Sequence, residues 1–206
     1  MKNILFSCLL LLSLAVQAQS DYSKLDLNFG LGTNIYSWKA QPVWNLQGEL
    51  HINARWSLLY NYNLGSIDTN NLYFHAPMSL YAVGPVTRFL AQNSYTITDF
   101  FSSLAVGLLT ALIPEGVAYH YPLAYRYDLS TYANPLGLAF VFSTNPALDQ
   151  RIRYQTNVGV KLTYYSRLGL IANVHTQLNY TGYYGFYQSA GLGIGYAFGS
   201  RNLGTD

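Results

Sequence analysis

Charged residues are scarce in this sequence, and cysteine is nearly absent. Asp, Glu, Lys and Arg make up 10% of the 206 residues, against about 25% in an average soluble domain. The one cysteine, Cys8, lies in the N-terminal apolar run, so a chain that has lost this run has no thiol for disulfides or for metal binding. The formal net charge of +2 gives no reason to expect a nucleic-acid partner.

Long apolar runs are also missing beyond the N-terminus. The mean hydropathy is only +0.10, although hydrophobic residues make up 50% of the chain, because Asn, Gln, Ser, Thr and Gly are interleaved with the apolar residues. A membrane-spanning helix needs about 20 mostly apolar residues in a row, whereas a strand of a membrane barrel needs them only at alternate positions. The composition therefore favours a β-barrel over a helical membrane protein.

The N-terminus has the pattern of a secretory signal peptide. Lys2 precedes an apolar run at 4–16, and the small residues Val16 and Ala18 follow at the positions that a signal peptidase reads. The run has about a dozen residues, too few to span a bilayer. Cleavage after Ala18 would divide the chain into a signal peptide at 1–18, an exported barrel domain at 19–198 and a C-terminal tail at 199–206.

Apolar and polar side chains alternate over most of the remaining sequence. In residues 158–180, VGVKLTYYSRLGLIANVHTQLNY, almost every even-numbered position is apolar or aromatic, and polar side chains stand between them. A period of two predicts an extended strand with one apolar face. Pro122 is the weak point of one such strand. The pattern predicts eight strands, at about 24–36, 44–53, 56–64, 117–122, 125–142, 158–165, 168–180 and 189–198.

The segment at 66–115 breaks the alternation. A helix fits residues 99–113 better than a strand does, because Thr98 or Asp99 can cap its start and Pro114 ends it. Residues 77–90 fit a second helix, interrupted by Gly84 and Pro85. We therefore predict an all-β fold, an antiparallel up-and-down transmembrane β-barrel of eight strands with an apolar helical insertion at about 66–115. If the insertion formed two strands instead, the barrel would have ten.

Aromatic residues gather at the ends of the predicted strands, as in the interfacial girdles of membrane barrels. With the N-terminus in the periplasm, short turns near Ala54, Tyr125 and Ser166 lie at the inner rim, and we expect the longer connections, including the insertion, at the outer rim. The expected outer girdle contains Trp38, Trp44, Tyr119, Phe142 and Tyr180. The expected inner girdle contains Trp56, Tyr164, Tyr196 and Phe198.

The signal peptide and the last strand, SAGLGIGYAF at 189–198, carry a resemblance to a known family. The chain resembles the small eight-stranded outer-membrane barrels of Gram-negative bacteria, and we expect a Bacteroidota-like member. This resemblance implies that the barrel-assembly machinery reads the last strand, with Phe198 as its terminal aromatic residue. The sequence departs from that pattern in continuing for eight residues beyond Phe198.

The polar faces of the strands predict a filled barrel interior, because eight strands leave just enough room for side chains. We interpret the interior as a hydrogen-bonded plug and expect no general-diffusion pore, no metal site and no cofactor. The acid–base candidates are Glu49, His51, His120 and His175. The polar candidates for ligand binding are Asn61, Lys161, Asn173 and Gln177.

No catalytic motif accompanies these residues. The sequence lacks the nucleophile elbow of hydrolases, the zinc-binding His-Glu-x-x-His and a phosphate-binding loop. We expect an outer-membrane protein with a structural, lipid-contacting or partner-binding role, in contact with outer-membrane lipid and with a possible protein partner at the 66–115 insertion. The alternatives are a narrow channel of ten strands and a lipid-modifying enzyme.

Overall fold

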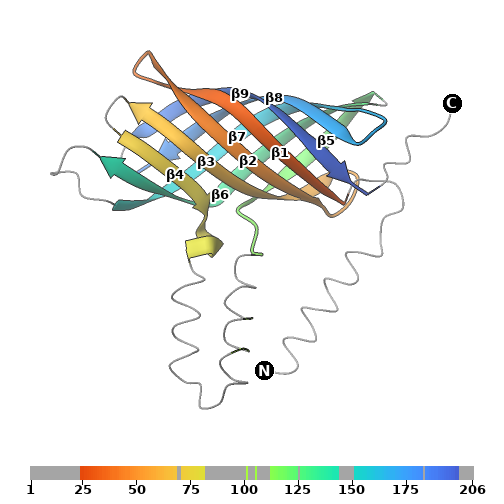
Figure 1. Cartoon of the computed structure of the whole chain (residues 1–206), viewed down its shortest axis with the longest axis horizontal. Coiled ribbons are helices and arrows are strands. Elements are labelled where there is room, and N and C mark those ends of the chain that lie inside the picture. The colour runs from red at the N-terminus through yellow and green to blue at the C-terminus, as the bar shows by residue number, and fades with distance from the viewer. Residues whose placement is uncertain are drawn as a thin grey trace.

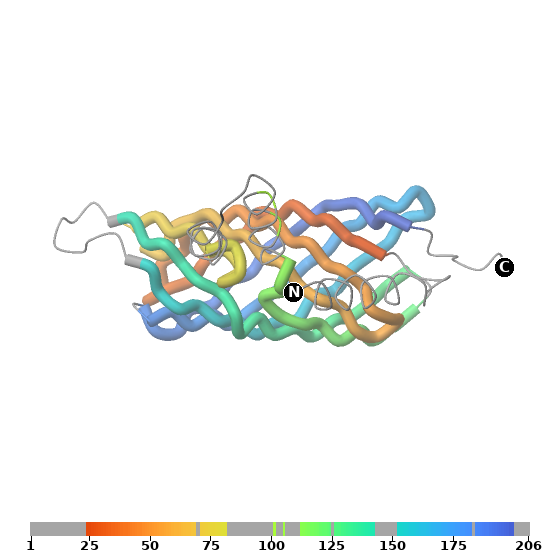
Figure 2. The backbone as a smooth tube through the Cα atoms, turned by 90° about the horizontal axis from the view of Figure 1, so that it is seen from below, coloured from red at the N-terminus to blue at the C-terminus, as the bar shows by residue number. Residues whose placement is uncertain are grey.

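Alternation of side chains along each strand produces a closed antiparallel barrel (Figures 1 and 2). The structure, a computed structural model, describes residues 24–68, 71–81, 101, 105, 112–124, 126–143, 151–182 and 184–199. Its strands are β1 (Leu25–Tyr36), β2 (Lys39–His51), β3 (Trp56–Asp68), β4 (Asn71–Pro77), β5 (Gly116–Ala124), β6 (Tyr127–Ser143), β7 (Arg151–Tyr165), β8 (Leu170–Thr181) and β9 (Gly185–Phe198).

Nine strands occupy eight positions around the barrel. β1 pairs with β2 on one side and with β9 on the other, which closes the sheet. β4 and β5 each pair with both β3 and β6. β4 lies beside the second half of β3, and β5 lies beside its first half. The two short strands therefore act as the two halves of one interrupted strand. The prediction of an eight-strand barrel is confirmed, and the ten-strand alternative is wrong.

The interruption leaves the register on β3 unchanged. β4 pairs His75 with Asn63, and β5 pairs Gly116 with Leu59. Three residues of β3, 60–62, lie between these pairs. In an unbroken partner strand, Ala76, Pro77 and Glu115 would lie opposite them. Residues 78–114 are therefore an insertion into a strand, and they leave the wall opposite 60–62, near the middle of β3.

The structure corrects the predicted boundaries of the insertion. Ser66 belongs to β3, and the residues from Asn71 to Pro77, expected within the insertion, form β4. The insertion also leaves from the wall and not from the outer rim. Helical residues are described at 78–81, 101 and 105, and the rest of the expected helices at 77–90 and 99–113 lies outside the described residues. In the described part of the chain, no helix is long and apolar enough to cross a membrane.

The apolar face of each strand points outward. On β1, Leu27, Phe29 and Leu31 are 42%, 45% and 52% exposed, whereas the intervening Asp26 and Asn28 are 1% and 4% exposed. A soluble barrel would have the opposite arrangement, because its apolar side chains would fill the interior. An apolar exterior around a polar interior is the arrangement of a transmembrane β-barrel.

Both chain ends of the barrel lie at one rim, here called the terminal rim, where β1 begins beside the last residue of β9. The connections at 52–55, 125–126 and 166–169 lie at this rim, as the sequence predicts. The opposite end, here called the far rim, has the connections at 37–38, 69–70, 144–150 and 182–184. Three of these four are two or three residues long, so the expectation that the longer connections gather at this end is wrong.

Pro122 is compatible with β5 because of where β5 ends. The pairing of β5 with β3 stops at Tyr119, opposite Trp56, while the pairing with β6 continues to Ala124. Pro122 therefore lies beyond the last β3 partner, where a missing backbone N–H breaks no bond on that side.

The interior is filled in layers. Near the far rim, buried apolar and aromatic side chains form a cluster, here called the tyrosine plug, of Val43, Ile67, Tyr73, Ala139, Val141, Tyr184 and Tyr187. The Tyr73 hydroxyl accepts a hydrogen bond from Asn34 Nδ2 at 3.0 Å, and the Tyr187 hydroxyl accepts one from Gln155 Nε2 at 2.9 Å. Amide side chains fill the middle layer, and charged side chains gather toward the terminal rim.

Candidate functional site

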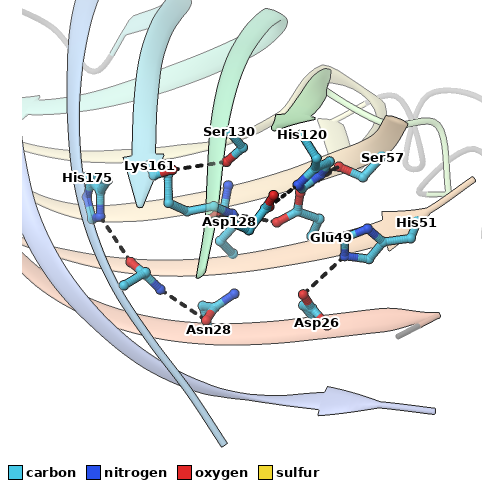
Figure 3. Close-up of polar contacts among 12 residues, drawn as sticks. Asp26, Asn28, Glu49, His51, Ser57, His120, Asp128, Ser130, Lys161 and His175 are labelled. Carbon is cyan, nitrogen blue, oxygen red and sulfur yellow. Dashed lines mark hydrogen bonds and ion pairs between the residues drawn. The ribbon is translucent and has the colours of Figure 1, made fainter. Parts of the chain in front are cut away.

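Six strands deliver charged or hydroxyl side chains to one place inside the barrel near the terminal rim (Figure 3). Each is 7% exposed or less. Their positions follow from strand parity, since each lies on the inward face of its strand. We call this group the ionic cluster: Asp26 of β1, Glu49 and His51 of β2, Ser57 of β3, His120 of β5, Asp128 of β6 and Lys161 of β7.

A buried ion pair joins opposite sides of the barrel at the centre of the cluster. Lys161 Nζ lies 2.5 Å from Glu49 Oε2 and 3.3 Å from Gln47 Oε1. The pair connects β7 to β2 across the interior. Removing either partner would leave a buried charge without its ion-pair partner, which makes the pair important for the integrity of the fold.

His120 lies between two carboxylates. Its Nδ1 is 2.5 Å from Asp128 Oδ2, and its Nε2 is 2.9 Å from both Glu49 Oε1 and Ser57 Oγ. Ser57, His120 and Asp128 thus have the spacing of a hydroxyl nucleophile, its base and the residue that orients the base. The Ser57 hydroxyl, however, donates to Glu49 Oε1 at 2.5 Å.

Burial and hydrogen bonding both oppose a nucleophilic role for Ser57. The side chain is completely buried, so a substrate carbonyl has no approach to it in this structure. Glu49 Oε1 competes with His120 for the Ser57 hydroxyl, to which it is the nearer of the two acceptors. The three residues form part of a polar packing network.

His51 has a separate carboxylate partner. Its Nε2 lies 3.1 Å from Asp26 Oδ2, which also accepts the Tyr165 hydroxyl at 3.0 Å. The His51 and His120 rings lie 4.9 Å apart, so the two histidine–carboxylate pairs are neighbours. The ionic cluster as a whole combines three carboxylates with one lysine and two histidines.

The other residues singled out from the sequence lie in the amide layer. Asn173 donates to Asn28 Oδ1 at 3.1 Å, and His175 Nδ1 lies 3.4 Å from Asn173 Oδ1. Gln177 accepts the Tyr132 hydroxyl at 2.9 Å, and Asn61 Oδ1 accepts Asn45 Nδ2 at 3.2 Å. The structure therefore brings Glu49, His51, His120 and Lys161 together. His175 lies opposite Lys161 on the neighbouring strand and contacts Asn173 of the amide layer.

A third buried histidine–carboxylate pair lies at the interruption of the wall. His75 Nε2 is 2.7 Å from Glu115 Oε1, and both side chains are completely buried. The other oxygen, Glu115 Oε2, accepts the backbone N–H of Asn61 at 3.2 Å. These two residues flank the insertion in sequence, and their meeting depends on β4 and β5 sharing one strand position.

Sequence reasoning missed three members of the ionic cluster: Asp26, Ser57 and Asp128. Asp26 stands in the predicted polar face of its strand, and its parity alone places it inside. Ser57 and Asp128 follow the same rule, and each is the second residue of a strand that follows a turn. Counting every inward polar position near the turns at 52–55 and 125–126, and at the start of the first strand, would have found all three.

Aromatic side chains of the predicted girdles lie on the outside near the rims. At the terminal rim, Tyr196 packs on Phe198 with ring centroids 4.9 Å apart, and Arg126 donates to the Tyr164 hydroxyl at 3.3 Å. Trp38 lies in the far-rim turn and is 98% exposed. Farther along the strands, Trp44 and Tyr180 are also exposed on the far half of the barrel.

One girdle residue was assigned to the wrong rim. Tyr119, expected at the outer rim, pairs with Trp56 at the terminal rim, and their rings lie 4.9 Å apart. The assignment failed because β5 begins in the middle of the wall, so that its aromatic residues lie half a strand closer to the terminal rim than a full strand would place them.

Comparison with known proteins identifies the fold and no family. No family model matches the sequence, and no curated protein matches it. The N-terminal β-barrel domain of Pseudomonas aeruginosa OprF is similar with a TM-score of 0.50 and 14% identity, over 85% of this chain and 97% of that chain. Ail, the attachment invasion locus protein of Yersinia pestis, aligns with a TM-score of 0.47 and 9% identity, over 86% and 99%.

A designed transmembrane β-barrel aligns with a TM-score of 0.44 and 11% identity, over 85% of this chain and 96% of that chain. At 14% identity, the similarity to the OprF domain concerns the fold alone. The fold is that of a transmembrane β-barrel.

Proposed function

We propose that this chain is an outer-membrane protein of a Gram-negative bacterium, with a sealed barrel that acts through contacts made outside its wall. The observation that carries the proposal is the exit of residues 78–114 between β4 and β5. The exit lies about 14 Å along β3 from Trp56, at about 3.4 Å per residue. A segment that leaves the wall there meets lipid tails or another apolar protein before it meets water.

Side chains at the exit satisfy backbone groups that have no strand partner. The Tyr60 hydroxyl donates to the Leu112 carbonyl at 2.5 Å, and Ser79 Oγ donates to the Ile113 carbonyl at 2.8 Å. An unsatisfied backbone group costs several kcal/mol in hydrocarbon, where water cannot compensate. These bonds suit a chain that leaves the barrel inside the lipid layer.

The composition of the insertion suits the same surroundings. The 78–114 segment has two charged residues in its sequence, Arg88 and Asp99. Its described apolar side chains are exposed: Met78, Leu80, Phe101, Leu112 and Ile113. We propose that this segment contacts outer-membrane lipid and binds an apolar membrane protein.

The packed interior supports a barrel without an open pore. The tyrosine plug fills the far half, and the ionic cluster fills the terminal half. A narrow channel would need a continuous hydrated path past both. Planar-bilayer recordings of the refolded protein test this point: we expect no conductance steps, and steps of constant size would favour the channel alternative.

A crosslinking experiment tests the partner-binding role. A photoreactive phenylalanine analogue at Phe101 (61% exposed) is compared with one at Leu192 of β9 (67% exposed) in the native membrane. We expect a defined protein adduct from position 101 and lipid adducts alone from position 192. Lipid adducts alone at both positions would leave lipid contact as the role of the insertion. Equal protein adducts at both positions would contradict a specific partner-binding site on the insertion.

The lipid-modifying enzyme remains the alternative from a different class. The distances among Ser57, His120 and Asp128 favour it, and the burial of Ser57 opposes it. Membrane lipids from cells with and without Ser57→Ala protein would differ in acylation if the enzyme reading were correct. We expect identical lipid profiles.

Export and assembly form the last part of the proposal. We propose cleavage after Ala18, a periplasmic terminal rim and recognition of β9 by the barrel-assembly machinery through Phe198, which is 45% exposed on the outer face. The Bacteroidota-like origin stays a prediction. Phe198→Asp should lower the amount of assembled barrel in cells without preventing refolding in detergent, whereas Ile194→Asp, in mid-strand, should impair both.

A further inference from the structure

Glu49, His51 and His120 bring three metal-binding side chains together near the terminal rim. One ligand atom from each lies within 4.8 Å of the others, and all three residues are buried. Bonds from a metal ion to imidazole nitrogen or carboxylate oxygen measure about 2.0–2.2 Å, so two of them span about 4 Å. Side-chain shifts of well under about 1 Å would therefore bring the three atoms onto one ion.

Both histidines are already oriented as metal ligands usually are. His120 directs Nδ1 at Asp128 Oδ2 (2.5 Å), and His51 directs Nε2 at Asp26 Oδ2 (3.1 Å). A metal-bound histidine commonly donates its second ring N–H to a carboxylate, which fixes the ring and strengthens the ligand. The nitrogens that a metal would take are His51 Nδ1 and His120 Nε2, and the latter already lies 2.9 Å from both Glu49 Oε1 and Ser57 Oγ.

Metal binding requires both imidazoles in the neutral form, and the ionic cluster then has more negative than positive charge. With neutral imidazoles, the three carboxylates outweigh Lys161 by two charges. Asp26 Oδ1 and Asp128 Oδ1 are buried acceptors without a hydrogen-bond partner among the described residues. A divalent cation held by the two imidazoles would balance the charge of the whole cluster.

We propose that the ionic cluster binds one divalent transition-metal ion through Glu49, His51 and His120. Imidazole with carboxylate suits Zn²⁺, Cu²⁺ and Ni²⁺ better than Ca²⁺ or Mg²⁺, which prefer oxygen alone. Glu49 binds through Oε1 and keeps Lys161 on Oε2. The site is reached from the terminal rim, since His51 is the last residue of β2 and retains slight exposure. This inference does not depend on the role proposed for the insertion.

The test uses mature protein without a histidine tag, refolded in detergent both with and without the metal, so that access to the interior does not limit binding. Zn²⁺ titration calorimetry should give one ion per barrel. Electron paramagnetic resonance of bound Cu²⁺ should show hyperfine coupling to two imidazole nitrogens. His51→Gln should weaken binding at least tenfold, and Asp128→Asn should weaken it by about 10–100-fold.

His175→Gln is the matched control, because this histidine lies inside the same barrel outside the cluster. It should bind the metal as the unaltered protein does. Faster gel migration of unboiled samples verifies that each variant is folded. Absence of stoichiometric binding in protein refolded with the metal would overturn the proposal. Equal binding by folded His51→Gln and His175→Gln variants would overturn it as well.

Discussion

The Glu115 carboxylate accepts the backbone N–H of Asn61 at 3.2 Å, where an unbroken strand would have provided a carbonyl. Asn61 belongs to β3, opposite the point at which the chain leaves the wall. Glu115 thereby serves as a side-chain substitute for a missing strand bond, and its other oxygen is held by His75. The interrupted wall stays closed because a buried polar pair completes it.

Glu115→Ala should destabilise the barrel by about 1–3 kcal/mol, since it leaves the Asn61 N–H and the His75 ring without an acceptor in a buried place. Urea unfolding in lipid vesicles, followed by tryptophan fluorescence, measures the change in the free energy of unfolding. Glu115→Gln is the control, because it keeps one carbonyl oxygen, and it should lose less. Equal losses for the two variants would contradict the acceptor role.

Deleting residues 78–114 should yield a folded barrel with one continuous fourth strand. The register of β3 against His75 and Gly116 already allows this join. Pro77→Thr and Glu115→Thr accompany the deletion. Proline cannot donate to the ladder of a central strand, and residue 115 would lie opposite Tyr60 on the lipid-facing side of the joined strand, where a charge is unfavourable. The measurement is gel mobility with and without boiling. A matched deletion of 78–113, one residue shorter, should fold poorly because it shifts every following side chain to the other face.

Lys161→Met should cost about 3–5 kcal/mol, because it leaves the Glu49 carboxylate buried without its partner. Glu49→Gln alone should also destabilise the barrel. The double variant should recover most of the loss, since it removes both charges together. A double-mutant cycle of unfolding free energies measures the coupling, and an additive result would show that the two side chains do not act as a pair.

Gly195→Ala should destabilise the seam between β1 and β9 by about 1–3 kcal/mol through overpacking. A Cβ at this position would collide with the backbone carbonyl of Leu27 on the facing strand. Gly48→Ala is the control, because there the nearest atoms, of Leu27 and Tyr60, lie 3.7 Å from the new Cβ. Thermal unfolding should separate the two variants, and equal melting temperatures would contradict the steric argument.

Side-chain alternation was sufficient to predict most of the fold. It places Asp26 inside and Leu27 outside without any knowledge of the barrel, because each strand residue has only two directions available. The same rule placed Glu49, His51, His120 and Lys161 in the interior. It could not bring them into one cluster, because contact between β2, β5 and β7 depends on how the sheet closes.

β4 escaped prediction for a local reason. It has seven residues, and its inward positions include Tyr73 as well as Asn71 and His75. An aromatic residue on the inner face removes the contrast between polar and apolar positions on which the period-two signal depends. Tyr73 is tolerated inside because the tyrosine plug surrounds its ring and Asn34 binds its hydroxyl, which are tertiary contacts that a single sequence does not reveal.

Because the register is unchanged across residues 78–114, the junction of Pro77 and Glu115 is a site where other peptide segments could be inserted. Loops at the rim of a barrel display their cargo in water. A peptide grafted between β4 and β5 would instead be presented sideways, within the plane of the membrane, by a scaffold in which the two half-strands keep one register on β3.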